Sequence, residues 1–459
     1  MKQMTVRAVI MTVLCILFSA GIAIFIGIYI KDGADWALYP ANRHIYTDGI
    51  ISQAGSITDR NGTVLCKTVD GKRVYSDNKT IRLATAHAVG DTSGFISTGV
   101  HNAFLEELTG YNLVNGVYSV TGNGSDIRLT LDADVCVTAL QALGNYKGVV
   151  GAYNYKTGEL ICMVSTPTVD VSDSQSLISA KEDEDSAAFL NRFISATYPP
   201  GSTFKVVTAT AAIETFDDAY EREYVCESGC VIDGEKITCM GHHGSIKLKE
   251  ALAHSCNAYF SQLAADLGKE TMTKYAEKFG FNKGFSLDGI TAKTSSYNVD
   301  DARDVDLAWS GMGQYTDMFN PLQYLTAMGS IANGGSAKQP YIIKSVTNEL
   351  GIPAKLTGSS TYSMLSKSTA NQIKELMMSN VELEYGASSF PGLSVGAKSG
   401  TAEVAEGITP NAVFVGFSTD EALPIAFVVC VENGGSGTLR AGSIANKVLQ
   451  KCKEKNIGV

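Results

Sequence analysis

An uncharged apolar stretch near the N-terminus sets the first limit on how this chain can fold. Residues 8–30 contain no charged side chain and are rich in Ile, Val, Leu and Phe. As a helix the stretch would reach roughly 35 Å, at ~1.5 Å per residue, and would span the hydrocarbon core of a bilayer. It therefore predicts one transmembrane helix, and the chain after it must fold on one side of a membrane.

The charges that flank this stretch predict its orientation. Lys2 and Arg7 precede it, whereas Lys31 is followed at once by Asp32. Because positive charge is retained on the cytoplasmic side, we expect residues 31–459 to lie outside the cell membrane. A cleaved signal peptide is the alternative, but its apolar region is typically only about 7–15 residues long. The length favours an uncleaved single-pass anchor.

Composition indicates a folded remainder. The chain has 459 residues, of which 45% are hydrophobic and 18% charged, which is enough for two or three domains with a large core. The net charge is −10, and Lys and Arg form no cluster. Because a basic patch is the usual sign of nucleic-acid binding, we expect no nucleic acid among the partners.

The ten cysteines do not follow the spacing of a small disulfide-rich domain. Cys226, Cys230 and Cys239 lie close together and are followed by His242 and His243. Zinc binding is one interpretation, but the spacing fits no common zinc finger. Outside the membrane we favour a disulfide or reduced surface thiols, and we expect neither a metal nor a cofactor. Ordinary buried thiols are expected at Cys66, Cys136, Cys162, Cys256 and Cys430.

The order of predicted elements indicates an α+β fold. Short apolar runs between turn residues favour strands and loops up to residue 128, and a strand end at 129–131 precedes a helical pattern that runs to 143. Residues 149–155 and 160–165 flank a Lys-Thr-Gly turn and predict a β-hairpin. Helical patterns dominate residues 202–333.

Strand patterns return in the last part of the chain, at residues 393–399, 411–418 and 424–432, and an amphipathic helix is expected at 443–453. These late strands would complete an antiparallel sheet that the hairpin begins, with helices on its faces.

The first candidate for chemistry is Ser202, in a Pro-Pro-Gly-Ser-Thr-Phe-Lys segment that precedes an apolar helical run. We expect Ser202 at the start of that helix, where backbone N–H groups favour developing negative charge. Lys205 lies one turn later on the same face. A serine needs a base to act as a nucleophile, and a lysine whose pKa is lowered by burial can serve.

Two further motifs follow in the chain. A Ser-x-Asn motif at residues 255–257 follows a helical run, and a Lys-Ser-Gly-Thr motif at 398–401 ends a predicted strand. Such short motifs recur by chance. Residues 76–79 repeat Ser-x-x-Lys, residues 76–78 and 296–298 repeat Ser-x-Asn, and residues 156–158 read Lys-Thr-Gly. We expect 156–158 to form the hairpin turn and 76–79 to be a solvated loop with no helix start.

In this order and context the three motifs resemble those of penicillin-binding proteins and class A β-lactamases. Further segments resemble class B penicillin-binding proteins, namely residues 54–62, 148–167, 313–314, 320–323, 331–335 and 401–403. Residues 38–43 are most similar to the penicillin-binding protein A subgroup. The resemblance covers nearly all of residues 36–450. It implies a serine transpeptidase domain of the β-lactamase-like fold and peptidoglycan D,D-transpeptidase activity, with β-lactam antibiotics as acylating ligands.

The resemblance also implies which residues carry out the reaction. Ser202 would attack the penultimate D-Ala carbonyl of a stem peptide, and Lys205 would accept its proton. Ser255 would relay a proton to the departing D-Ala. The backbone N–H groups of Ser202 and Thr401 would form an oxyanion hole. An amine of a second stem peptide would then take the acyl group.

The remaining motif residues would bind the substrate. Asn257 would hold a side-chain amide of the stem peptide, and Lys398 would supply positive charge. Ser399 and Thr401 would bind the terminal carboxylate, and Gly400 would let the substrate backbone approach the strand closely.

The chain is accordingly divided into three parts: a cytoplasmic stub and anchor (1–34), a smaller pedestal-like N-terminal domain (35–145) and the penicillin-binding transpeptidase domain (146–459). The family also implies a polytopic membrane glycosyltransferase as a partner. Two alternatives remain open. One is a D,D-carboxypeptidase or β-lactamase-type hydrolase, in which water removes the acyl group, and the other is a non-catalytic β-lactam sensor or scaffold.

The charge bias around residues 8–30 predicts the topology directly. Protease added to intact, wall-stripped cells should digest nearly the whole chain, because residues 31–459 are expected outside. Immunoblotting of the chain checks this, with a cytoplasmic protein as the control for intact cells. Protection of the bulk of the chain, or a mature N-terminus near residue 21, would contradict the anchor.

Overall fold

The computed structural model describes residues 2–458 except 40–45, 48–49, 52–53, 115, 118–123, 184–186, 349 and 356. Of the segments that suggested the family resemblance, residues 40–43 lie outside this described part.

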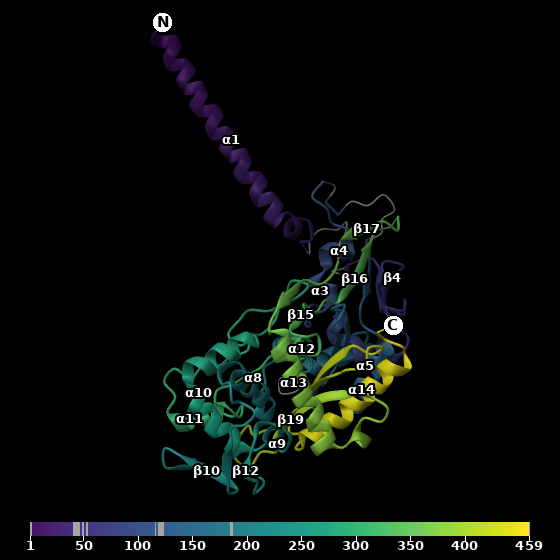
Figure 1. The fold of residues 1–459 in the computed structure, drawn as a ribbon. Helices are drawn as coiled ribbons and strands as arrows, with labels where there is room; N and C mark the ends of the chain where they lie inside the picture. Colours follow the sequence, from purple (N-terminus) through teal and green to yellow (C-terminus); the bar gives the residue numbers. More distant parts are fainter. Residues whose placement is uncertain are drawn as a thin grey trace.

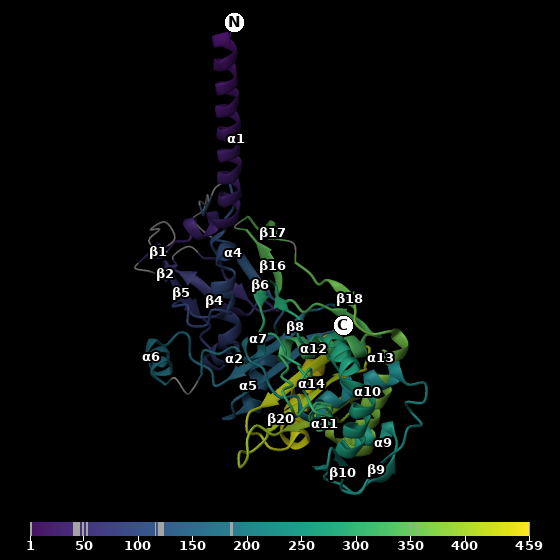
Figure 2. The ribbon, with the colours of Figure 1, turned by 90° about the vertical axis from the view of Figure 1, so that its left-hand side faces the viewer.

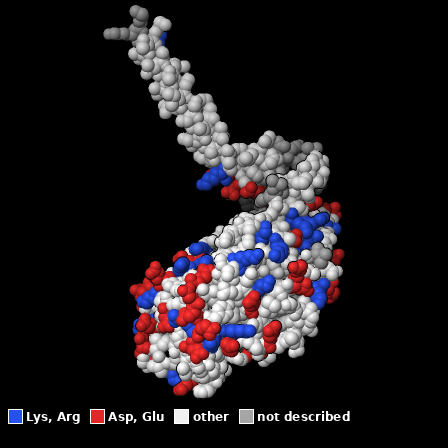
Figure 3. Space-filling model, in the orientation of Figure 1, with Lys and Arg blue, Asp and Glu red and all other residues white. Residues whose placement is uncertain are grey.

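A long N-terminal helix, α1 (Lys2–Ala37), projects from the body of the protein (Figures 1 and 2). Its segment Met4–Ala37 has a mean hydropathy of 2.8 over its most apolar part, none of which is buried. In Figure 3 the helix is an almost uncharged rod, and charged residues gather where it meets the body. Because such an exposed apolar surface needs a non-aqueous environment, the helix fits a single-pass membrane anchor.

A five-stranded antiparallel sheet forms the centre of the larger part of the body, in the order β19-β20-β21-β7-β8. The strands are β7 (Gly148–Asn154), β8 (Leu160–Thr166), β19 (Val395–Ala402), β20 (Asn411–Ser418) and β21 (Ile425–Val431). Every residue of β7, β8, β20 and β21 is buried, because helices cover both faces. The predicted hairpin, its turn at residues 156–158 and its pairing with the late strands are confirmed.

The helices on the two faces come from distant parts of the chain. Helices α5 (Ala133–Leu143) and α14 (Ser443–Glu454) contact each other and lie against β8 and β21. Helix α12 (Pro321–Ala332) contacts β7, β20 and β21 from the other face. Helix α13 (Lys367–Asn380) packs on β19, the edge strand.

A second, six-stranded sheet lies between this region and α1, in the order β17-β16-β6-β3-β4-β5 (Figure 2). Four strands come from the N-terminal region: β3 (Ile57–Thr58), β4 (Val64–Val69), β5 (Lys72–Tyr75) and β6 (Asp126–Leu129). The other two, β16 (Ile343–Thr347) and β17 (Pro353–Lys355), come from far along the chain, and β16 pairs antiparallel with β6. The N-terminal sheet is thus completed by a segment of the C-terminal half.

The N-terminal region also contains helices that its sequence did not suggest: α2 (Lys79–Val89), α3 (Val100–Ala103) and α4 (Leu105–Thr109). The Asn78 side chain accepts hydrogen bonds from the N–H groups of Thr80 and Ile81 and so caps α2. The expectation that residues 76–79 lack a helix start is therefore wrong, although Lys79 is solvent-exposed as expected.

Beyond β19 lies a mainly helical region, as the pattern over residues 202–333 predicts. It contains α8 (Lys205–Thr215), α9 (Leu248–Ala253), α10 (Asn257–Lys278) and α11 (Asp304–Ser310). Two small hairpin-like pairs interrupt the helices: β9 (Tyr224–Cys226) with β12 (Gly244–Ile246), and β10 (Gly229–Ile232) with β11 (Glu235–Thr238). The remaining short elements are β1 (Tyr46–Thr47), β2 (Ile50–Ile51), α6 (Ser174–Glu182), α7 (Arg192–Ser195), β13 (Ser286–Leu287), β14 (Ile290–Thr291), β15 (Ser336–Lys338) and β18 (Thr361–Ser363).

Close packing of α12 on the central sheet predicts a sharp response to one added methyl group. A Cβ at Gly329 would overlap the Tyr153 hydroxyl of β7, so Gly329→Ala should destabilise the protein by about 1–3 kcal/mol. Gly442→Ala is the control, because a Cβ there would lie 3.4 Å from the Phe414 ring, an ordinary contact. Calorimetric Tm values of the two variants check this, and equal Tm values would contradict the described packing of α12.

Candidate active site

Ser202 lies in the short 3-10 turn η2 (Gly201–Phe204), which leads directly into α8. Gly201 has a φ of +51°, and a Cβ on it would lie 3.1 Å from Cβ of Ala402 in β19. Glycine therefore allows both the left-handed backbone and the close approach to the sheet edge. The Ser202 side chain stays partly exposed, and its place at the start of a helix is as predicted.

Lys205 is fully buried directly behind the serine. Its Nζ donates hydrogen bonds to Ser202 Oγ at 3.0 Å and to Asn257 Oδ1 at 2.6 Å. It also donates to the backbone oxygen of Ser255 at 2.7 Å. Burial lowers the pKa of Lys205 to about 7, so a neutral amine is available near neutral pH. An amine in this state, within reach of a hydroxyl, can act as a general base.

Ser255 lies between two lysines. Its Oγ accepts hydrogen bonds from Lys205 Nζ at 3.2 Å and from Lys398 Nζ at 3.1 Å. Burial and the neighbouring Lys205 both lower the pKa of Lys398 well below its ordinary value. Because two buried like charges repel, the pair resists full protonation, and the shared hydroxyl links the two amines.

Asn257 begins α10 and contacts protein groups at both ends of its amide. Its Oδ1 accepts from Lys205, and its Nδ2 donates to the backbone oxygen of Thr238 at 3.0 Å. An amide has two lone pairs and two N–H groups, so one of each remains for a substrate.

The Lys-Ser-Gly-Thr motif lies in β19, at the open edge of the five-stranded sheet. Lys398 is fully buried, Ser399 is partly exposed and Thr401 is exposed. A Cβ on Gly400 would lie 2.7 Å from the backbone oxygen of Pro200, so glycine is required for the turn before Ser202 to meet this strand. The structure thus brings all eight sequence-predicted residues to one place.

Tyr385 is a residue of the site that the sequence motifs did not reveal. It lies at the end of the short π-helical turn η3 (Val381–Tyr385), and burial raises its pKa to about 12, which keeps its hydroxyl protonated. This hydroxyl donates to Ser399 Oγ at 3.0 Å and accepts from Ser399 N–H at 2.8 Å. It therefore orients the Ser399 side chain. Its only sequence signal is an aromatic residue in a Glu-rich helix end, which matches no motif.

The segment around residues 313–324 supports the Ser202 turn from behind. The Gly201 N–H donates to the backbone oxygen of Gly313 at 3.0 Å, and the Tyr324 hydroxyl donates to that of Thr203 at 3.0 Å. The Asn320 side chain caps α12 and donates to the backbone oxygen of Ala196 at 2.9 Å. These contacts give a physical reason for the presence of the 313–324 segment together with the three motifs, because it holds the Ser202 turn in place.

The cysteines differ in part from expectation. All cysteines of the described residues are free thiols, so the disulfide considered for Cys226, Cys230 and Cys239 is absent from the described structure. Cys226 is buried and therefore is not a surface thiol either. The buried thiols expected at five other positions are confirmed, but the Sγ atom of one of them, Cys256, lies within 4.8 Å of those of Cys226 and Cys239.

Comparison with known proteins adds an independent line of evidence. Residues 148–451 match the family model of the penicillin binding protein transpeptidase domain. Peptidoglycan D,D-transpeptidase PbpA of Mycolicibacterium smegmatis is 28% identical over 436 residues, covering 86% of this chain and 87% of that protein. The imipenem acyl-enzyme complex of penicillin-binding protein A from M. tuberculosis is 25% identical with a TM-score of 0.78, covering 88% and 99% of the two chains. The D,D-transpeptidase domain of a peptidoglycan glycosyltransferase from Eggerthella lenta is 26% identical with a TM-score of 0.78, covering 89% and 100%.

The buried Lys205 amine predicts how reaction with a fluorescent penicillin depends on pH. Lys205 accepts a proton only when neutral, and an amine is neutral above its pKa. The second-order acylation rate should therefore rise with pH through about 7 and then level off.

Substitutions separate the two lysines. Lys205→Arg should lose acylation almost as completely as Lys205→Ala, because guanidinium stays protonated. Lys398→Arg should retain part of the rate, because that position needs charge and not proton exchange. If Lys205→Arg acylated near the wild-type rate, another group would be the base.

Proposed function

The chain belongs to the penicillin-binding protein transpeptidase family, and we propose that it acts as a peptidoglycan D,D-transpeptidase through the eight residues gathered at the edge of β19. The observation that carries the proposal is the 3.0 Å hydrogen bond from the buried Lys205 amine to Ser202 Oγ. A nucleophile paired with a base of lowered pKa is what acyl transfer requires. The named transpeptidase relatives and their β-lactam acyl-enzyme complexes support the same activity.

Acylation begins at Ser202. Its Oγ attacks the penultimate D-Ala carbonyl of a donor stem peptide, and the Lys205 amine takes the hydroxyl proton. The developing oxyanion is held by the backbone N–H groups of Ser202 and Thr401, each such donor contributing about 3–4 kcal/mol. Collapse of the intermediate forms the serine ester and breaks the amide bond to the terminal D-Ala.

The departing D-Ala needs a proton, and Ser255 is placed to deliver it. Its hydroxyl contacts both lysine amines, at 3.2 Å and 3.1 Å. The proton taken from Ser202 by Lys205 passes through this hydroxyl to the leaving amine, which restores the neutral lysine for the next half-reaction.

Substrate binding uses the exposed face of the same strand. The terminal carboxylate of the donor lies against the hydroxyls of Ser399 and Thr401. Its negative charge raises the pKa of Lys398, so this lysine gains its positive charge as the substrate binds. Asn257 holds a stem-peptide amide with the N–H and lone pair that the protein leaves unused.

In the second half-reaction an amine of a neighbouring stem peptide takes the acyl group and releases Ser202. In a D,D-carboxypeptidase or β-lactamase-type enzyme, water would do so. A non-catalytic scaffold has no need for the continuous hydrogen bonds that join Ser202, Lys205, Ser255 and Lys398.

The rest of the chain positions this domain at the wall. Helix α1 anchors the chain with residues 31–459 outside the membrane. Residues 35–145 form a pedestal, stiffened by the pairing of β16 with β6, that holds the active site away from the bilayer. The partner that supplies new glycan is a polytopic membrane glycosyltransferase, as the family implies.

The nucleophile is tested by mass spectrometry after reaction with penicillin. A single covalent adduct should map to Ser202 and should be absent from Ser202→Ala, whose fold is expected to be intact because the side chain is partly exposed. Ser76→Ala, which removes the other Ser-x-x-Lys serine, is the matched control and should label normally. An adduct on Ser76 or Ser255, or labelling that persists in Ser202→Ala, would refute the assignment.

A further inference from the structure

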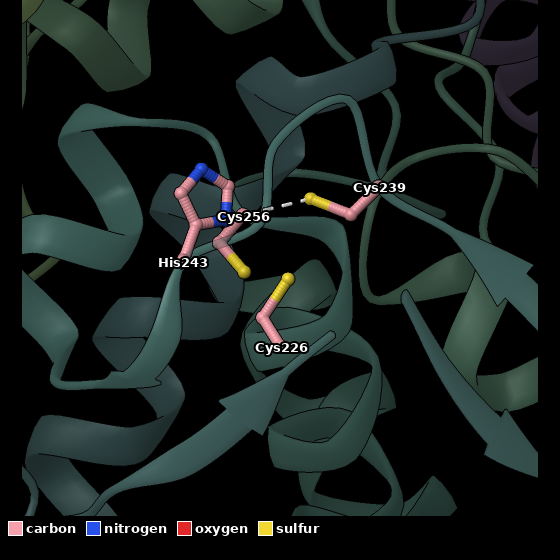
Figure 4. A group of neighbouring side chains, drawn as sticks. All are labelled: Cys226, Cys239, His243 and Cys256. Atoms are coloured by element: carbon pink, nitrogen blue, oxygen red, sulfur yellow. Dashed lines mark hydrogen bonds between the residues drawn. The ribbon is translucent and has the colours of Figure 1, made fainter. Parts of the chain in front are cut away.

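Four side chains with metal-binding atoms meet beside the active site. Cys226, Cys239, His243 and Cys256 place three Sγ atoms and one imidazole nitrogen within 4.8 Å of one another (Figure 4). The Cys239 Sγ and His243 Nδ1 atoms are 3.7 Å apart. Around tetrahedral zinc, bond lengths of about 2.3 Å to sulfur and 2.0–2.1 Å to nitrogen separate neighbouring ligand atoms by roughly 3.5–3.8 Å. One ion at the centre therefore reaches all four with small side-chain adjustments.

Backbone pairing fixes three of these residues independently of any ion. Cys226 ends β9 and is paired with Gly244, and its backbone oxygen accepts from His243 N–H at 3.1 Å. Cys239 directly follows β11, and its N–H donates to the backbone oxygen of Ser228 at 3.0 Å. Two separate strand pairs thus bring three ligands to one point.

The fourth residue, Cys256, is part of the catalytic machinery's own loop. It is the central residue of the Ser-x-Asn motif, between Ser255 and Asn257, and it is completely buried. From the cluster, we propose that Cys226, Cys239, His243 and Cys256 bind one structural Zn²⁺ ion, which fixes the loop that carries Ser255 and Asn257.

The donor set selects the metal. Three thiolates and one imidazole are soft and intermediate ligands that suit zinc, whereas calcium and magnesium require oxygen. Four protein ligands leave no open position for substrate or water, which is the pattern of a structural and not a catalytic zinc.

Backbone N–H groups also point at two of the sulfur atoms. Asn257 N–H donates to Cys239 Sγ, and Tyr259 N–H donates to Cys256 Sγ, each at 3.4 Å. Such hydrogen bonds stabilise a thiolate that ligates a metal and hold it in position. Both donors belong to the start of α10, so the cluster and the helix that begins at Asn257 support each other.

The loop has a physical need for such support. Ser255 adopts a φ of +54°, which is unfavourable for a residue with a Cβ, and yet its hydroxyl must lie between two lysines. Lys205 donates three of its hydrogen bonds to Ser255 and Asn257. Cys256 lies between these two residues in the chain. A metal bond to Cys256 therefore restrains both neighbours.

The competing occupant of this position is a disulfide. Disulfides are common outside the cell membrane, and a disulfide between any two of Cys226, Cys239 and Cys256 would remove two ligands from the cluster. Bound zinc holds the sulfurs as thiolates and prevents this.

The first test is the metal content of the full-length protein, purified in detergent without added metal and analysed by elemental mass spectrometry. We expect about one zinc per chain, and near-complete loss in Cys226→Ser and Cys239→Ser. Cys230→Ser is the matched control, because Cys230 lies in β10 outside the cluster and should leave the zinc content unchanged. Absence of zinc from the wild type, equal zinc in the variants and wild type, or a mapped disulfide among the three cysteines would overturn the proposal.

A second measurement avoids substitutions that could unfold the chain. Zinc removed from wild-type protein by a chelator is replaced by Co²⁺, which should show sulfur-to-cobalt charge-transfer bands and intense visible bands of tetrahedral coordination. Octahedral cobalt spectra would contradict the assigned ligands.

The role of the ion is tested by the acylation rate with a fluorescent penicillin. Removing zinc should lower the rate about tenfold or more, and Zn²⁺ but not Mg²⁺ should restore it. An unchanged rate in zinc-free protein would refute the loop-fixing role. The metal content is measured separately, so zinc-loaded wild type that never labels would refute the transpeptidase proposal and leave the metal site standing.

Discussion

Two buried lysine amines that share one serine hydroxyl are the interaction on which the rest of this structure depends. Burial disfavours charge on both Lys205 and Lys398, and the neighbouring Lys205 lowers the pKa of Lys398 further. The arrangement persists because each amine has several acceptors, including Ser255 Oγ for both. A buried amine that lacks some of its hydrogen-bond acceptors is unfavourable, so every element that supplies an acceptor to Lys205 or Lys398 must be placed accurately.

That requirement explains the packing around the site. Lys205 comes from α8, Ser255 from the loop before α10 and Lys398 from β19. These three elements are far apart in the chain and are brought together only by tertiary packing. Contact between the Ser202 turn and β19 is possible only because Gly201 and Gly400 lack a Cβ. The closely packed central sheet, with α12 behind it, holds β19 in position, and Tyr385 fixes the partly exposed Ser399 hydroxyl from the side. The glycines where the Ser202 turn meets β19 and the buried strands behind β19 therefore both hold Ser202 and the Lys-Ser-Gly-Thr motif in place.

The sequence predicted what depends on local pattern and left out what depends on distant contacts. Apolar runs buried on both faces identified β7, β8, β20 and β21, and motif order identified the eight site residues. Helix α2 was missed although Asn78 is a good N-cap residue, because its surroundings are charged and turn-like. The pairing of β16 with β6 joins segments about 200 residues apart and leaves no local signal. Tyr385 belongs to no motif, and only the fold brings it to Ser399. Cys256 was grouped with ordinary thiols because Cys226, Cys239 and His243, which it meets in the fold, lie on other elements.

Exposure in the site separates proton transfer from recognition. The two lysines are fully buried, Ser202, Ser255 and Ser399 are partly exposed, and Thr401 is exposed. The hydroxyls and the strand edge are therefore open to a ligand, whereas the lysine amines lie behind them where water is excluded and electrostatic interactions are stronger. The buried lysine pair lies behind Ser202, where a serine ester would form. Transpeptidases, carboxypeptidases and β-lactamases have such an ester in common. The exposed side of the site, where residues 403–409 form a fully exposed loop after β19, is the side from which an acceptor has access to such an ester.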